Sequence, residues 1–124
     1  MREMISVSPY IVVEDVKESL QYYQGIFGGD IRILNEHQDR VLHAELHLGE
    51  SLLHFSDTFG RTPKPENLRL IMQFDNEEEL KAVYEALEAD GDVLVELQDT
   101  FFGALHGQVQ DRKNGLIWVL NYMK

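Results

Sequence analysis

Apolar residues recur along this chain with two different periods, and the two periods separate predicted helices from predicted strands. From Val16 to Phe27 apolar side chains return every three or four residues, the spacing of one helix face. Asp15 and Glu18 provide a capping pair at the start, and the glycines at 28 and 29 provide a stop. The pattern therefore predicts an amphipathic helix over residues 16–27.

A second helix with the same layout is predicted about sixty residues later, at a distance too long for a solenoid repeat. Asp75 with Glu78 is expected to open it, and residues 90–92 are expected to close it. Its apolar stripe consists of Leu80, Val83, Tyr84 and Leu87. The neighbouring acidic residues are interpreted as a solvated helix face.

Short strands are predicted around both helices. Residues 6–13 are rich in β-branched and aromatic side chains, and Pro9 indicates an edge strand or a bulge there. The other strands of the first half are expected near 30–35, 41–48 and 51–56, with Gly49-Glu50 as a tight turn. Those of the second half are expected near 93–98, 105–110 and 116–122, with a turn at 112–115.

The two halves nearly repeat each other, and each reads as β-α-β-β-β. We therefore predict an α+β fold in which two βαβββ modules, related by pseudo-two-fold symmetry, form a curved, cleft-enclosing mixed sheet. Half of this chain would bury too little surface to be stable alone, so residues 1–124 are predicted to form a single domain. Module 1 covers about residues 1–58 and module 2 about residues 68–124. Pro63 and Pro65 stiffen the linker between them, residues 59–67.

Alternation along the third strand of each half predicts which side chains face away from the helix. Leu42, Ala44, Leu46 and Leu48 form one row, which leaves Val41, His43, Glu45 and His47 on the other. In the second half, His106 occupies the position equivalent to His43. If the sheets curl toward each other, both histidines line a shared concavity, which is a candidate binding site. His37 and His47 are expected to be exposed residues at strand ends.

Composition narrows the classes of function. The formal net charge of −11 disfavours nucleic acid and anionic membranes as partners. There are no cysteines, which excludes a thiol nucleophile, disulfides and thiolate zinc sites. No apolar run is long enough to span a bilayer, and the N-terminus lacks the layout of a signal peptide. We expect a cytoplasmic protein that does not contact membranes.

Several motifs carry a family resemblance that runs nearly from end to end. They are Pro9-Tyr10, residues 26–29, residues 42–46 with Gly49, Ser56-Asp57, residues 97–104, Asp111 and residues 118–121. Together with the double βαβββ layout they resemble the vicinal oxygen chelate superfamily, which includes glyoxalase I, bleomycin-resistance proteins and extradiol dioxygenases, and within it the PhnB-like group. The resemblance implies two-fold dimers, and open sheet edges also favour association, so we expect a homodimer. One fold of this kind supports many chemistries, so function does not follow from it.

The resemblance also implies metal ligands on the first and last strand of each half. The corresponding first-strand positions are Ser8 and Leu68, and the last-strand positions are His54 or Phe55 and Trp118 or Val119. At most one imidazole remains of a site that needs three or four ligands, so we expect no metal and no other cofactor. The alternative is a relocated divalent metal held by His43, Glu45 and His47 with help from His106.

The leading hypothesis is a small-molecule-binding protein whose pocket lies between the modules and lacks the usual metal. Its predicted ligand-binding residues are Tyr10, His43, Glu45, His54, Phe101, His106 and Trp118. The alternative is a metal-dependent or histidine-based lyase, isomerase or dioxygenase, in which His43 and Glu45 are the candidate catalytic residues. A purely structural protein fits less well, because it leaves the inward polar residues unexplained. No glycine-rich loop is present to bind a methyl-donor nucleotide, so the methyltransferase label used for this group has no support in the sequence.

Overall fold

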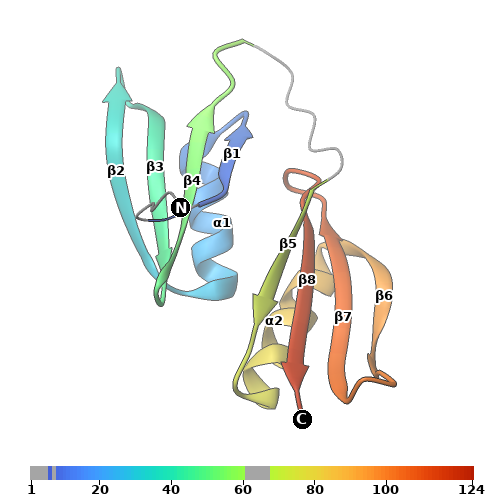
Figure 1. Ribbon diagram of the computed structural model, residues 1–124. Helices are drawn as coiled ribbons and strands as arrows, with labels where there is room; N and C mark the ends of the chain where they lie inside the picture. Colours follow the sequence, from blue (N-terminus) through green and yellow to red (C-terminus); the bar gives the residue numbers. More distant parts are fainter. Residues whose placement is uncertain (1–5, 7, 61–67) are drawn as a thin grey trace, which may run out of the picture. The chain divides into compact units, whose positions relative to one another are not determined.

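A computed structural model of the chain describes residue 6, residues 8–60 and residues 68–124. It contains two compact units, each built from four strands and one helix (Figure 1). The first unit comprises β1 (Tyr10–Val13), α1 (Val16–Phe27), β2 (Asp30–His37), β3 (Arg40–Leu48) and β4 (Ser51–Asp57). The second comprises β5 (Arg69–Gln73), α2 (Glu77–Ala89), β6 (Gly91–Asp99), β7 (Ala104–Asp111) and β8 (Ile117–Met123).

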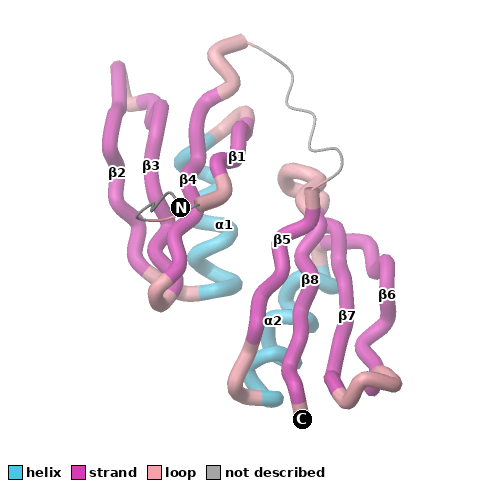
Figure 2. The backbone as a smooth tube through the Cα atoms, viewed as in Figure 1, coloured by secondary structure: helices cyan, strands magenta, loops and turns pink. Residues whose placement is uncertain are grey.

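The strand order is the same in both units. The first sheet runs β1-β4-β3-β2 and the second runs β5-β8-β7-β6. In each unit the first strand is parallel to the last one, and the remaining pairs are antiparallel. Each helix covers one face of its own sheet (Figure 2). The predicted α+β fold of two βαβββ modules is therefore confirmed.

Aromatic packing joins each helix to its sheet. In the first unit the Tyr23 ring of α1 stacks on Phe55 of β4, with centroids 5.5 Å apart, and both residues are fully buried. In the second unit the Tyr84 ring lies so close to β7 that a Cβ on Gly107 would be 2.9 Å from Tyr84 Cε1. Gly107 therefore permits a close approach of helix and strand that a larger residue would block.

The first helix is capped as predicted, but the predicted cap of the second helix is wrong. Asp15 accepts a hydrogen bond from the backbone N–H of Glu18 at 3.0 Å. The cap of α2 is Asn76, which accepts from Glu79 N at 3.0 Å, and not Asp75. The reason is that Phe74 N still donates to Asn121 O at 2.9 Å, so the sheet pairing extends to residue 74. Asn76 then has the extended backbone that a cap needs.

The hairpin between β2 and β3 is longer than predicted. β2 continues to His37, which pairs with Arg40, and the two residues between them have positive φ angles of 49° at Gln38 and 64° at Asp39. A two-residue turn with positive φ angles normally contains glycine or asparagine. Neither occurs at positions 38 and 39, so the sequence does not indicate a tight turn here. The first strand is shorter than the predicted range 6–13, because β1 begins at Tyr10. Most of the predicted linker, residues 61–67, lies outside the described residues.

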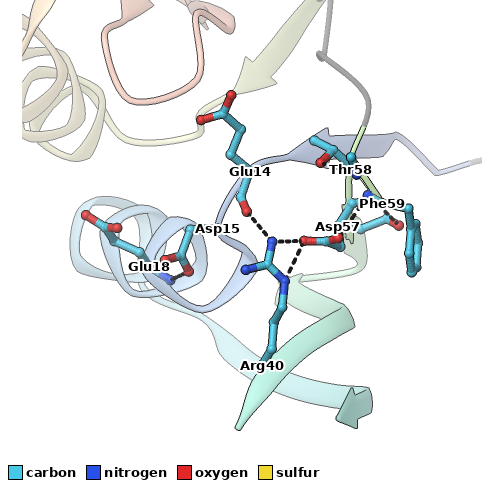
Figure 3. Close-up of polar contacts among 9 residues, drawn as sticks. Glu14, Asp15, Glu18, Arg40, Asp57, Thr58 and Phe59 are labelled. Atoms are coloured by element: carbon cyan, nitrogen blue, oxygen red, sulfur yellow. Dashed lines mark hydrogen bonds and ion pairs between the residues drawn. The ribbon is translucent and has the colours of Figure 1, made fainter. Parts of the chain in front are cut away.

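A buried carboxylate joins three segments of the first unit. Asp57, at the end of β4, receives an ion pair from Arg40 and a hydrogen bond from Phe59 N at 2.9 Å (Figure 3). Arg40 also donates to the backbone oxygen of Glu14 at 2.9 Å. The side chain of Asp57 is 6% exposed, so it is a structural anchor for the segment before α1, the start of β3 and the end of β4.

Asp111 is the corresponding anchor of the second unit. It accepts from Trp118 Nε1 and from Asn114 N, both at 2.7 Å, and it is 1% exposed. These bonds hold the predicted turn at 112–115 against the first residues of β8. Within the described part of the chain, no helix has the length and apolar character required to cross a membrane.

Candidate functional site

The strand register places His43 and Glu45 on the sheet face opposite α1. Residues that pair across neighbouring strands point to the same face, and Ala44 pairs with Phe55, which stacks on the helix. Glu45 pairs with His54, so both lie on the other face. The predicted orientation of the His43 row is therefore confirmed for this unit.

Four side chains on this face form a connected group, here called the histidine array: His43, Glu45, His47 and His54. His43 Nε2 lies 3.0 Å from His54 Nδ1. His54 Nε2 lies 3.8 Å from Glu45 Oε2, and His47 Nε2 lies 2.8 Å from Glu45 Oε1. His47 is thus only 27% exposed and bonded to Glu45, not the exposed strand-end residue expected.

Tyr10 of β1 completes the array on one side. Its ring stacks on His54 with centroids 6.0 Å apart and tilts against His43 at 5.6 Å. The Tyr10 side chain is nevertheless 60% exposed. A large aromatic surface beside polar ring nitrogens is a common feature of small-molecule sites.

The array favours the ionised form of Glu45. The hydrogen bond from His47 lowers the pKa of Glu45, with further lowering by electrostatic interactions with His47, His54 and Arg32 and an opposing effect of partial desolvation. Arg32 of β2 reaches this face because it pairs with Glu45 across the strands. Glu45 is therefore a carboxylate at neutral pH and accepts hydrogen bonds only.

Replacing Glu45 with glutamine should remove a pH-dependent contribution to stability. Since folding lowers the Glu45 pKa, the ionised group stabilises the fold above its ordinary pKa, and this stabilisation is lost as the pH falls through the lowered pKa. The difference in unfolding free energy between wild type and Glu45→Gln should shrink from about pH 6 to about pH 3, as measured by denaturant titration. Glu50→Gln, in the exposed β3–β4 turn, is the control and should show no such trend.

His106 lies in an equivalent position of the second unit but has different partners. Its Nδ1 lies 3.1 Å from Asn121 Oδ1, and its Nε2 lies 3.1 Å from Gln108 Nε2. Asn121 Nδ2 donates to Gln73 Oε1 at 3.0 Å, and Arg69 donates to Gln108 Oε1. Both ring nitrogens of His106 are therefore engaged within the unit.

Two predicted ligand-binding aromatics of the second unit are not beside His106. Trp118 pairs with Val109 on the α2 side, is 1% exposed and donates to Asp111. Phe101 is fully exposed at the β6–β7 turn, and it is Phe102 whose ring lies 6.3 Å from His106, edge to face. The last-strand position on the His106 side is Val119, which pairs with Gln108.

The donors needed for a metal ion are not brought together. Across the described residues, no group of three or more His, Asp and Glu side chains has a geometry that could hold a metal. The Cα atoms of His43, Glu45 and His47 follow one another along one face of β3 at intervals of about 6.8 Å. His54 directs its two nitrogens toward His43 and Glu45.

Comparisons with known proteins agree on the fold. The family model of the Glyoxalase/Bleomycin resistance protein/Dioxygenase superfamily matches residues 5–120. Protein PA1353 from Pseudomonas aeruginosa has a similar structure, with a TM-score of 0.84, 23% identity, and coverage of 97% of this chain and 98% of that one. A putative 3-demethylubiquinone-9 3-methyltransferase, PhnB protein, from Bacillus cereus has a TM-score of 0.76, 22% identity, and coverage of 95% and 99%. No curated protein matches the chain.

Proposed function

Because the chain belongs to the glyoxalase/bleomycin resistance protein/dioxygenase superfamily, we propose that it binds a small organic ligand on the face of the first unit that carries Tyr10 and the histidine array. The observation that supports this proposal is the hydrogen bonding of the two ring nitrogens of His43. Its Nε2 is bonded to His54, whereas its Nδ1 has no hydrogen-bond partner among the described residues. A ring nitrogen left open beside an exposed aromatic ring is suited to bind a ligand.

A structural role alone explains this face less well. Glu45 and His54 are only 16% and 25% exposed, so their partial burial costs hydration that is best recovered by hydrogen bonds. A purely structural face could be covered by apolar side chains at lower cost. The array instead concentrates imidazoles and one carboxylate, which supports selection for binding.

We propose that this binding does not use the metal implied by the family. The first-strand position Leu68 and the last-strand position Val119 offer no ligand atom, and His54 is already oriented by His43 and Glu45. The residues present therefore do not fit the usual site.

Purified protein should accordingly contain no stoichiometric divalent metal. The check is elemental analysis by plasma mass spectrometry of protein prepared without chelators. One equivalent of zinc, nickel, manganese or iron per chain in wild-type protein, and its loss in His43→Ala, would instead support the metal-dependent enzyme.

A thermal-shift screen of small aromatic acids, phenols and amides tests the binding function. Compounds that bind should raise the melting temperature of wild type by mass action and should have a smaller effect on Tyr10→Ala. Phe101→Ala is the control, because Phe101 is fully exposed in the other unit. Stabilising compounds that act equally on wild type and Tyr10→Ala would place the binding site elsewhere.

A further inference from the structure

We infer that His43 Nδ1 is the atom that accepts a proton from the ligand, and that the ligand is a planar molecule with an acidic O–H or N–H group. In this arrangement His54 and Glu45 are positioning residues that act through His43. The inference rests on the proposed ligand-binding function, and it specifies the chemistry of that ligand.

The position of each proton in the histidine array follows from Glu45. Glu45 is a carboxylate and can only accept, and its Oε2 lies 3.8 Å from His54 Nε2, which is longer than a hydrogen bond. At this distance the negative charge still favours the tautomer that carries hydrogen on His54 Nε2. A neutral His54 then has a lone pair on Nδ1, and the 3.0 Å contact requires His43 Nε2 to donate to it. Neutral His43 is left with its lone pair on Nδ1. That nitrogen is the one open proton-accepting position of the His43–His54 pair.

His106 is oriented in the opposite way, with Nε2 as the acceptor. The chain of bonds in the second unit begins at Arg69, which can only donate, so Gln108 turns its oxygen to Arg69 and its amino group to His106 Nε2. His106 Nε2 therefore accepts, and Nδ1–H donates to Asn121. A second proton on His106 would meet the amino group of Gln108. Both ring nitrogens of His106 are thus engaged, and His106 is closed to a ligand.

The proton transfer involves only the ligand and side chains of the first unit. The O–H or N–H bond of the ligand breaks and an N–H bond forms at His43 Nδ1. The proton between the two rings can then move from His43 Nε2 to His54 Nδ1, so the positive charge passes to the ring next to the Glu45 carboxylate. The ligand retains the electron pair as an anion. No oxidant, metal or further reactant is required.

Other charged and titratable groups near the array do not change this assignment. Tyr10 of β1 contacts the His43 ring, and His47 of β3 donates to Glu45. From β2, Arg32 pairs with Glu45 and Asp30 pairs with His47. Within the described residues none of these groups forms a hydrogen bond with His43, whose bonded partner is His54. The tautomer of His43 is therefore set through His54.

Histidine ring NMR tests the proton positions directly. Two-bond proton–nitrogen spectra of the full chain above the histidine titrations should show His43 and His54 as Nε2–H tautomers and His106 as the Nδ1–H tautomer. Glu45→Gln should weaken the preference of His54, because an amide can also donate, whereas a merely structural role for Glu45 would leave the tautomers unchanged. Glu50→Gln is the control. An Nδ1–H tautomer for neutral His43 would overturn the inference.

Binding of two matched probes tests the ligand chemistry. Wild type should bind 4-nitrophenol about tenfold more tightly than 4-nitroanisole, which has the same ring but no proton to give. Absorbance should show a larger nitrophenolate fraction in the complex than in free solution at the same pH. Equal binding of both probes, lost in Tyr10→Ala, would overturn the inference and leave the binding function intact. Binding of neither probe would overturn the phenol-like ligand class, and the thermal-shift screen then decides the binding function separately.

Discussion

Replacing Asp111 with alanine should lower the free energy of unfolding by about 3 kcal/mol. Its carboxylate is 1% exposed and accepts from the Trp118 indole and from Asn114 N. The substitution removes two charge-assisted hydrogen bonds and leaves a buried indole N–H without this acceptor. Denaturant titration of the full chain, followed by the fluorescence of its one tryptophan, measures the change.

Asp92→Ala is the matched control for this prediction. Asp92 also bears a close ion pair, to Arg112 at 2.7 Å, but its side chain is 58% exposed. Removing it should leave stability nearly unchanged, because exposed ion pairs contribute little. Equal losses for Asp92→Ala and Asp111→Ala would contradict the view that burial makes Asp111 an anchor.

The second large effect is expected from His43→Ala, which should weaken binding of 4-nitrophenol about tenfold. The ligand would lose its hydrogen-bond acceptor, while the stability change should stay within about 1 kcal/mol because His43 lies outside the core. Titration calorimetry measures the affinity, and denaturant titration measures the stability.

His106→Ala should have the opposite effects: a loss of stability and little change in ligand affinity. The imidazole of His106 bonds to Asn121, which is only 6% exposed, so its removal leaves a buried amide oxygen unpaired and should cost about 1 to 2 kcal/mol of stability. Affinity for 4-nitrophenol should change little. If His106→Ala weakens binding as much as His43→Ala does, the two histidines share one ligand and the assignment of the site to the first unit is wrong.

Much of the fold could be predicted from residue patterns alone. The bounds of α1, 16–27, and both helix-facing rows follow from periodicity, because burial of an apolar stripe is a local property of the sequence. The Asn76 cap and the Gln38-Asp39 turn were missed, since each depends on where strand pairing ends. The pseudo-two-fold symmetry, the shared cleft, the single domain and the homodimer stay predictions.

The site was predicted in part. Alternation on one strand identifies His43 and Glu45, and the sequence also predicts Tyr10 and His54 as ligand contacts. Two strand pairings could not be predicted from the sequence: the parallel pairing of Tyr10 with His54 and the antiparallel pairing of His54 with Glu45. These pairings join three strands into one array. The sequence predicts Trp118 as a ligand contact, yet in the structure it donates to Asp111 on the helix side, so this part of the family motif maintains the fold.

A crystal structure of the protein soaked with 4-nitrophenol would locate the bound ligand directly. We expect the ligand ring beside Tyr10 and its oxygen within hydrogen-bond distance, about 2.8 Å, of His43 Nδ1. The His43–His54–Glu45 contacts should remain in place. Density for the ligand at another surface, or a ligand whose oxygen contacts His106 instead, would contradict the claim that the first unit carries the binding site.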